Sequence, residues 1–241
     1  MEEEADATAG ERRFAQLNID AIQQITALLP TSSLLALTAV SQELGRTFCP
    51  AVVKLAVSKV SLRAASLAPA LQGLSRRYPL LTDLDLSYSA ADDENLHYVA
   101  THFPQLTRLS LEGCDAVSDA GLDAIAHNLP TLLTLQLLGC RDVSDLGLQA
   151  LLARCTSLRA LHLGWCCVTD AGLRLVSSTL GSSLTFIDLS GCARVSDRGV
   201  RALVAACRNL NSMQLEGCRE LSGWAVAGAS SYLVRSALRA I

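Results

Sequence analysis

Cysteine has the greatest chemical potential in this sequence, because a thiolate can act as a nucleophile, bind a metal or form a disulfide. Nine cysteines are present, and no two of them form a Cys-x-x-Cys pair of the kind that binds zinc. Five recur every 26 residues: Cys114, Cys140, Cys166, Cys192 and Cys218. Regular spacing predicts that each occupies the same place in a repeating unit, as a buried free thiol with a structural role.

Histidine and aspartate are the other candidates for catalysis. The histidines show no metal-ligand spacing and no pairing with a nucleophile; they are His97, His102, His127 and His162. Four aspartates recur once per repeat after Ser or Thr: Asp119, Asp145, Asp170 and Asp197. We interpret them as residues that cap helix starts rather than as catalytic carboxylates. No glycine-rich phosphate loop occurs, so we expect no catalytic residue, metal or cofactor, and no enzyme.

Composition narrows the possible partners. The net charge is −3 and no basic run is present, which disfavours nucleic acid. No apolar stretch reaches the roughly 20 residues that span a bilayer, so no membrane partner is expected. The start Met-Glu-Glu-Glu has the wrong charge for a secretory signal. The sequence therefore predicts a cytoplasmic or nuclear protein, monomeric by itself.

The elements that position these residues follow from the repeat. The phrase L-x-x-L-x-L-x-x-C recurs in five segments, 106–114, 132–140, 158–166, 184–192 and 210–218, and residues 81–89 carry Ser89 in place of the cysteine. In such a phrase leucines two apart face the same side of a short strand. A Ser/Thr-Asp-x-Gly phrase follows, and after it Leu122, Ile125, Ala126 and Leu129 have helical spacing. Each unit is therefore expected to be a strand followed by a capped helix.

These phrases resemble the cysteine-containing leucine-rich repeats of F-box substrate receptors in cullin-based ubiquitin ligases, and of proteins similar to the antagonist of mitotic exit. The resemblance covers residues 81–222 and implies a right-handed α/β solenoid, a horseshoe like that of ribonuclease inhibitor. Residues 223–241 depart from the phrase and are interpreted as an atypical C-terminal cap, or as the point where a longer array is cut.

The N-terminal third divides into three predicted parts. Residues 1–11 form an acidic tail expected to be disordered, residues 12–48 a helical segment, and residues 49–80 a degenerate first repeat with a strand near 53–57 and a helix near 64–77. The helical segment resembles an F-box, with Asn18 and Leu44 where that family has Pro and Trp. The resemblance implies adaptor-binding positions at Ile25, Leu29, Leu34, Leu35, Leu37 and Val40. The alternative role of these helices is to cover the edge of the first repeat.

Partner binding is predicted on the concave face, where residues that alternate with the buried leucines point to solvent. Trp165 stands where four other repeats have Gly, which makes it the strongest candidate for a binding centre. The predicted partner-binding residues are Trp165, Phe186, His162, Leu138, Arg108, Gln136 and Asp188. Two functions remain open: a substrate-recognition subunit that binds a Skp-type adaptor and a protein or peptide target, or a free-standing interaction scaffold. An alternative role for Trp165 is to cover the one-residue deletion before Val168.

Overall fold

The structure is a computed structural model that describes residues 54–56 and 67–222. Strands and helices alternate through these residues. The strands are β1 (Lys54–Ala56), β2 (Asp83–Asp85), β3 (Arg108–Ser110), β4 (Thr134–Gln136), β5 (Ala160–His162), β6 (Phe186–Asp188) and β7 (Ser212–Gln214). The helices are α5 (Leu67–Arg77), α6 (Asp93–His102), α7 (Asp119–Asn128), α8 (Asp145–Leu152), α9 (Asp170–Leu180) and α10 (Asp197–Ala206).

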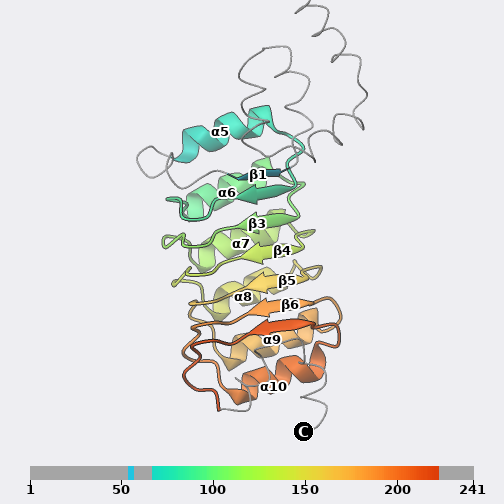
Figure 1. Ribbon diagram of the computed structural model, residues 1–241. Helices are drawn as coiled ribbons and strands as arrows, with labels where there is room; N and C mark the ends of the chain where they lie inside the picture. Colours follow the sequence, from blue (N-terminus) through green and yellow to red (C-terminus); the bar gives the residue numbers. More distant parts are fainter. Residues whose placement is uncertain (1–53, 57–66, 223–241) are drawn as a thin grey trace, which may run out of the picture.

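The strands form one parallel sheet in chain order, β1 to β7 (Figure 1). Equivalent leucines pair across neighbouring strands, as Leu109 does with Leu135 and Leu135 with Leu161. Parallel strands lie about 4.8 Å apart, whereas packed helices need about 8–10 Å. The helical side must therefore be longer than the strand side, which curves the stack and makes the sheet its concave face. The predicted α/β solenoid is confirmed.

The core is a column of leucine layers between the sheet and the helices. In β4 and just beyond it, Leu135 and Leu137 are both fully buried. On the helical side, the apolar residues with helical spacing complete the core, since Leu122, Ile125 and Leu129 are also fully buried. Each repeat therefore buries its apolar residues against its neighbours, and the strand register expected from the sequence is confirmed.

The five periodic cysteines lie buried at the corner between strand and helix. The thiol of Cys140 donates a hydrogen bond to the carbonyl of Leu111 in the preceding repeat (3.2 Å), and that of Cys192 does the same to Leu163 (3.1 Å). Burial raises the pKa of each of these two thiols to about 12, so both stay protonated at neutral pH and are poor nucleophiles. The structural role predicted for these cysteines is confirmed.

Each helix from α6 onward begins after an Asp, Ser or Thr whose side chain caps it. Ser118, for example, accepts a hydrogen bond from the backbone N–H of Ala120. Asp119, the first residue of α7, reaches instead into the next repeat. Its carboxylate accepts the backbone N–H of Ser144 (2.7 Å) and the hydroxyl of the same residue (2.6 Å). The prediction that the recurring aspartates cap their own helices is therefore wrong, because the Ser or Thr already does so.

The same contact joins every pair of adjacent repeats from α6 onward, and we call it the aspartate ladder. Its other members are Asp93 with Ser118, Asp145 with Thr169, Asp170 with Ser196, and Asp197 with Ser222. The glycine of the phrase belongs to this ladder, since a Cβ on Gly147 would collide with the Asp119 carboxylate. All three fixed residues of the Ser/Thr-Asp-x-Gly phrase thus build the joint between repeats.

In the described part of the chain, no helix has both the length and the apolar character that a membrane crossing requires.

Candidate functional site

A turn follows each strand from β2 to β7, and one residue of every turn has left-handed backbone geometry. Four are glycines, Gly113, Gly139, Gly191 and Gly217, with φ between 66° and 83°. The other two are Tyr88 (φ 58°) and Trp165 (φ 60°). For a residue with a side chain this conformation costs about 1–2 kcal/mol. The two aromatic residues therefore stand where the backbone favours glycine.

Trp165 is also one of two large hydrophobic side chains exposed among the described residues, at 58%. Its indole lies over Gly191 of the next repeat, where an added Cβ would come within 2.5 Å of the ring atoms Cδ2 and Cε2. Tyr88 lies over Gly113 in the same way and donates a hydrogen bond from its hydroxyl to Glu112. The indole therefore covers the following turn, and more than half of the tryptophan surface stays exposed.

Gly164 organises the neighbouring part of the concave face. The space that its missing side chain leaves is occupied by Leu138 from one side and approached by the Asp188 carboxylate from the other. Asp188 also accepts a hydrogen bond from the backbone N–H of Ser190 (2.8 Å) and is only 5% exposed. The expectation that Asp188 points freely into solvent is therefore wrong, because it packs over a glycine and bonds to its own turn.

His162 and Phe186 form a ring pair on adjacent strands, with centroids 4.5 Å apart and planes tilted by 35°. Burial lowers the pKa of His162 below its usual value, and the negative charges of Asp188 and Glu112 oppose this in part. The imidazole is therefore neutral at neutral pH. With Leu138 these residues make a half-buried patch of apolar surface and one carboxylate, which we call the strand patch: Leu138, His162, Phe186 and Asp188.

The structure does not bring all seven predicted residues together. Arg108 lies on β3, exposed, with Nη1 3.9 Å from Asp83. Gln136 lies on β4 and accepts a hydrogen bond from the hydroxyl of Ser110 (2.7 Å). Arg108 thus stands two strands from His162, and Gln136 is already bonded within the sheet. The strand patch, Trp165 and Gln136, which pairs with His162 on the adjacent strand, are the parts of the prediction that adjacent strands and turns hold near one another.

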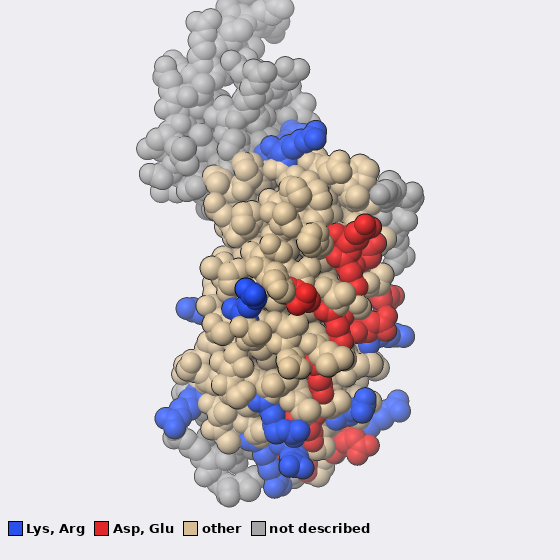
Figure 2. Space-filling view, turned by 180° about the vertical axis from the view of Figure 1, so that it is seen from behind, with Lys and Arg blue, Asp and Glu red and all other residues tan. Residues whose placement is uncertain are grey.

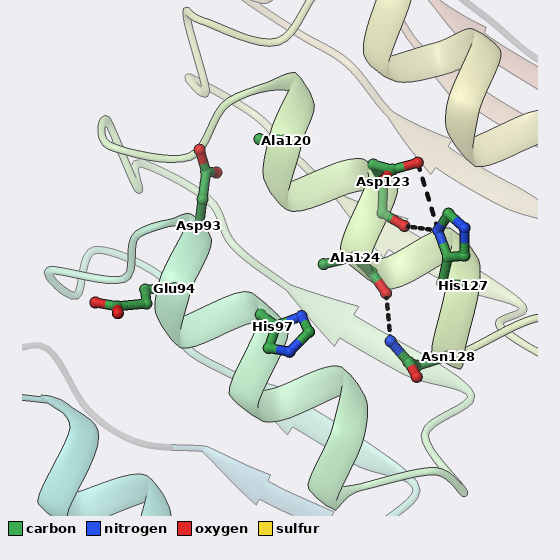
Figure 3. Close-up of a pocket in the computed structure, with 8 residues that line it drawn as sticks. All are labelled: Asp93, Glu94, His97, Ala120, Asp123, Ala124, His127 and Asn128. Atoms are coloured by element: carbon green, nitrogen blue, oxygen red, sulfur yellow. Dashed lines mark hydrogen bonds and ion pairs between the residues drawn. The ribbon is translucent and has the colours of Figure 1, made fainter.

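A second concavity lies on the opposite, helical side, as a groove of about 570 Å³ between α6 and α7 (Figure 3). The small side chains of Ala120 and Ala124 leave room there. Its rim carries His97 and Glu94 from α6, and His127, which contacts Asp123 (3.4 Å). Sequence reasoning gave no sign of this groove, because its residues come from two repeats. No group of three or more metal-ligating side chains occurs among residues 54–56 and 67–222.

The predicted adaptor-binding residues, from Ile25 to Val40, lie outside the described residues, as do the acidic tail and the C-terminal cap.

Leucine pairs on a parallel sheet, buried corner cysteines and capped outer helices define the chain as a leucine-rich-repeat solenoid of the cysteine-containing kind. A family model described as the SKP2 LRR domain matches residues 43–223. The chain therefore belongs to the SKP2-type leucine-rich-repeat family.

A comparison with solved structures supports the fold of this chain and nothing further. A chain in the crystal structure of the Rad7 and Elc1 complex in yeast is similar, with a TM-score of 0.51 and 17% identity. The match covers 76% of this chain and 54% of that one, so this chain spans about half the length of its neighbour. No curated protein matches.

Proposed function

We propose that this protein is the substrate-recognition subunit of a cullin-based ubiquitin ligase. In this proposal residues 12–48 hold a Skp-type adaptor, and the concave face holds a protein or peptide target in the cytoplasm or nucleus. The family match over residues 43–223 carries the proposal. The similar yeast chain comes from a complex of Rad7 with Elc1, which is consistent with a fold of this kind serving in an assembly.

The direct test is co-purification of the full chain with a Skp-type adaptor. We expect a stable complex, and we expect Leu34→Asp with Leu37→Asp to abolish it, because a buried unpaired charge at an apolar interface costs several kcal/mol. The matched control places the same two charges at exposed positions of the solenoid, Ala120→Asp and Gln149→Asp, and should leave the complex intact.

A free-standing interaction scaffold is the second candidate function. Asn18 and Leu44 favour it, since they replace two signature residues of the F-box. If no adaptor co-purifies with the unaltered chain under any salt condition, the ligase proposal fails and the scaffold remains.

Trp165 is the proposed centre of target binding. Trp165→Ala is expected to weaken the binding of a selected target by at least about 2 kcal/mol, or roughly 30-fold. The loss in folding stability should stay below about 1 kcal/mol, because the ring is more than half exposed. Affinities are measured by isothermal titration with peptides selected on the full chain from a random display library.

Trp165→Gly provides the control that separates binding from folding. Glycine accepts φ 60° without strain, so this variant should be at least as stable as Trp165→Ala while losing the same affinity. Target binding that is unchanged in both variants would show that the tryptophan only covers Gly191.

A further inference from the structure

Within helices α6 to α10, the exposed charges are sorted by sign along the solenoid. Leaving aside the ladder aspartates, the exposed acidic residues are Glu94 on α6 and Asp123 on α7. The exposed basic residues are Arg174 on α9 with Arg198 and Arg201 on α10. Helix α8 between them carries no charge apart from its ladder aspartate. Figure 2 shows several basic side chains gathered towards the C-terminal end, with others at the top and at mid-height, and acidic side chains in a band that runs down one side of this view.

The middle of this face carries one exposed apolar side chain. Leu146, the second residue of α8, is 70% exposed and is the other large exposed hydrophobic side chain of the described residues. Small residues flank it at the same helix position, Ala120 on α7 and Ala171 on α9. A single exposed leucine is ordinary on a protein surface. Here its place matters, because α8 is the third of the five helices from α6 to α10 and separates the two signs of charge.

We propose that the helical face is a self-association surface that pairs two copies of this chain about a two-fold axis. A rotation of 180° about an axis that lies in the interface, parallel to α8 and passing over Leu146 and Gln149, places α7 of one copy against α9 of the other, and α6 against α10. Asp123 then meets the partner's Arg174, and Glu94 meets the partner's Arg198. The two copies of Leu146 lie together at the centre. Each contact occurs twice, as an isologous interface requires.

The size of the face sets the strength of the association. Five helices of about 10 residues, spaced about 8–10 Å apart, present roughly 600 Å². This is below the roughly 800 Å² per partner of a standard interface. The face is also convex, so contact is greatest at α8 and its two neighbours. The dimer is therefore weak and sensitive to salt, and it forms at high protein concentration, in contrast to the monomer expected from the sequence.

The proposed interface runs from α6 to α10 and does not include the basic end of α5. Arg76 and Arg77 lie at that end of α5, on the N-terminal side of the acidic helices. In the proposed pairing the partner's α10 reaches only as far as α6, so these arginines lie beyond the contact. Both concave faces point away from the interface, and each stays open to its own target.

Sedimentation velocity of the full chain tests the proposal, over about 5–300 µM in roughly 50 mM and 500 mM salt. The average mass should rise from 25.6 kDa towards twice that value at low salt. Asp123→Arg and Arg174→Asp should each raise the dissociation constant at least about tenfold by placing like charges together. The two changes in one chain should restore it to within about threefold, and Leu146→Asp should abolish association.

Two charge reversals in exposed turns serve as matched controls, Asp115→Arg and Arg219→Glu. Both should leave the dissociation constant unchanged, and thermal melting checks that every variant is folded. A chain that stays at 25.6 kDa throughout overturns the proposal. So does association that the Asp123 and Arg174 variants leave unchanged, or a double variant that does not recover, since either places the contact elsewhere.

Discussion

Leu135→Ala is expected to lower the free energy of unfolding by about 2–5 kcal/mol. Leu135 is fully buried, and it pairs with Leu109 on one side and Leu161 on the other. The change leaves a cavity in the middle of the leucine column, where the flanking layers are fixed by their own strands and helices. Urea denaturation followed by circular dichroism measures the loss, and Leu161→Ala should give a similar value.

The neighbouring strand residue Gln136 is the matched control. It faces the concave side and loses one hydrogen bond from Ser110 when it is replaced by alanine, so Gln136→Ala should cost at most about 1 kcal/mol. Equal losses for Leu135→Ala and Gln136→Ala would contradict the assignment of the two faces of the sheet.

Asp119→Ala should lower the free energy of unfolding by about 2–3 kcal/mol, because it removes two charge-assisted hydrogen bonds to Ser144 from a half-buried joint. The exposed Asp115 offers a control in the same repeat, and Asp115→Ala should change stability by less than about 0.5 kcal/mol.

The size of the Asp119 effect distinguishes the joint from a simple helix start. A carboxylate that acts only on its own helix contributes about 0.3–1 kcal/mol. A double-mutant cycle with Ser144→Ala isolates the contact between repeats. A measured coupling near zero would mean that the aspartate ladder does not hold the repeats together.

Much of the fold could be predicted because the residues that each structural feature requires recur at equivalent positions in several repeats. Leucines two apart predicted the buried side of each strand, and recurring cysteines predicted the corner. The Ser or Thr before each helix predicted its cap. Each inference concerns one residue and its own turn or strand, so one repeat suffices to make it and the other repeats confirm it.

The predictions that failed concern contacts between repeats. An aspartate at the first position of a helix has the same sequence pattern whether it caps that helix or bonds to the next one, so only the structure could separate the two. Asp188 was expected to be exposed, but its burial depends on Gly164 in the neighbouring strand. One signal was available: four glycines at one register indicate a left-handed turn, which would have identified the strain at Tyr88 and Trp165.

The aspartate ladder also bears on how such a chain can change length. Each Ser/Thr-Asp-x-Gly phrase contains both halves of the joint. Its Ser or Thr donates hydrogen bonds to the aspartate of the preceding repeat, and its own Asp accepts them from the Ser or Thr of the following repeat. Any two repeats with this phrase are therefore compatible neighbours, whatever their original order. Recombination that removes or duplicates one whole repeat re-forms the joint at the seam, whereas a change that is not a whole number of repeats leaves an aspartate without its hydrogen-bond donors. Such an array can thus be lengthened or shortened by genetic exchange, one repeat at a time.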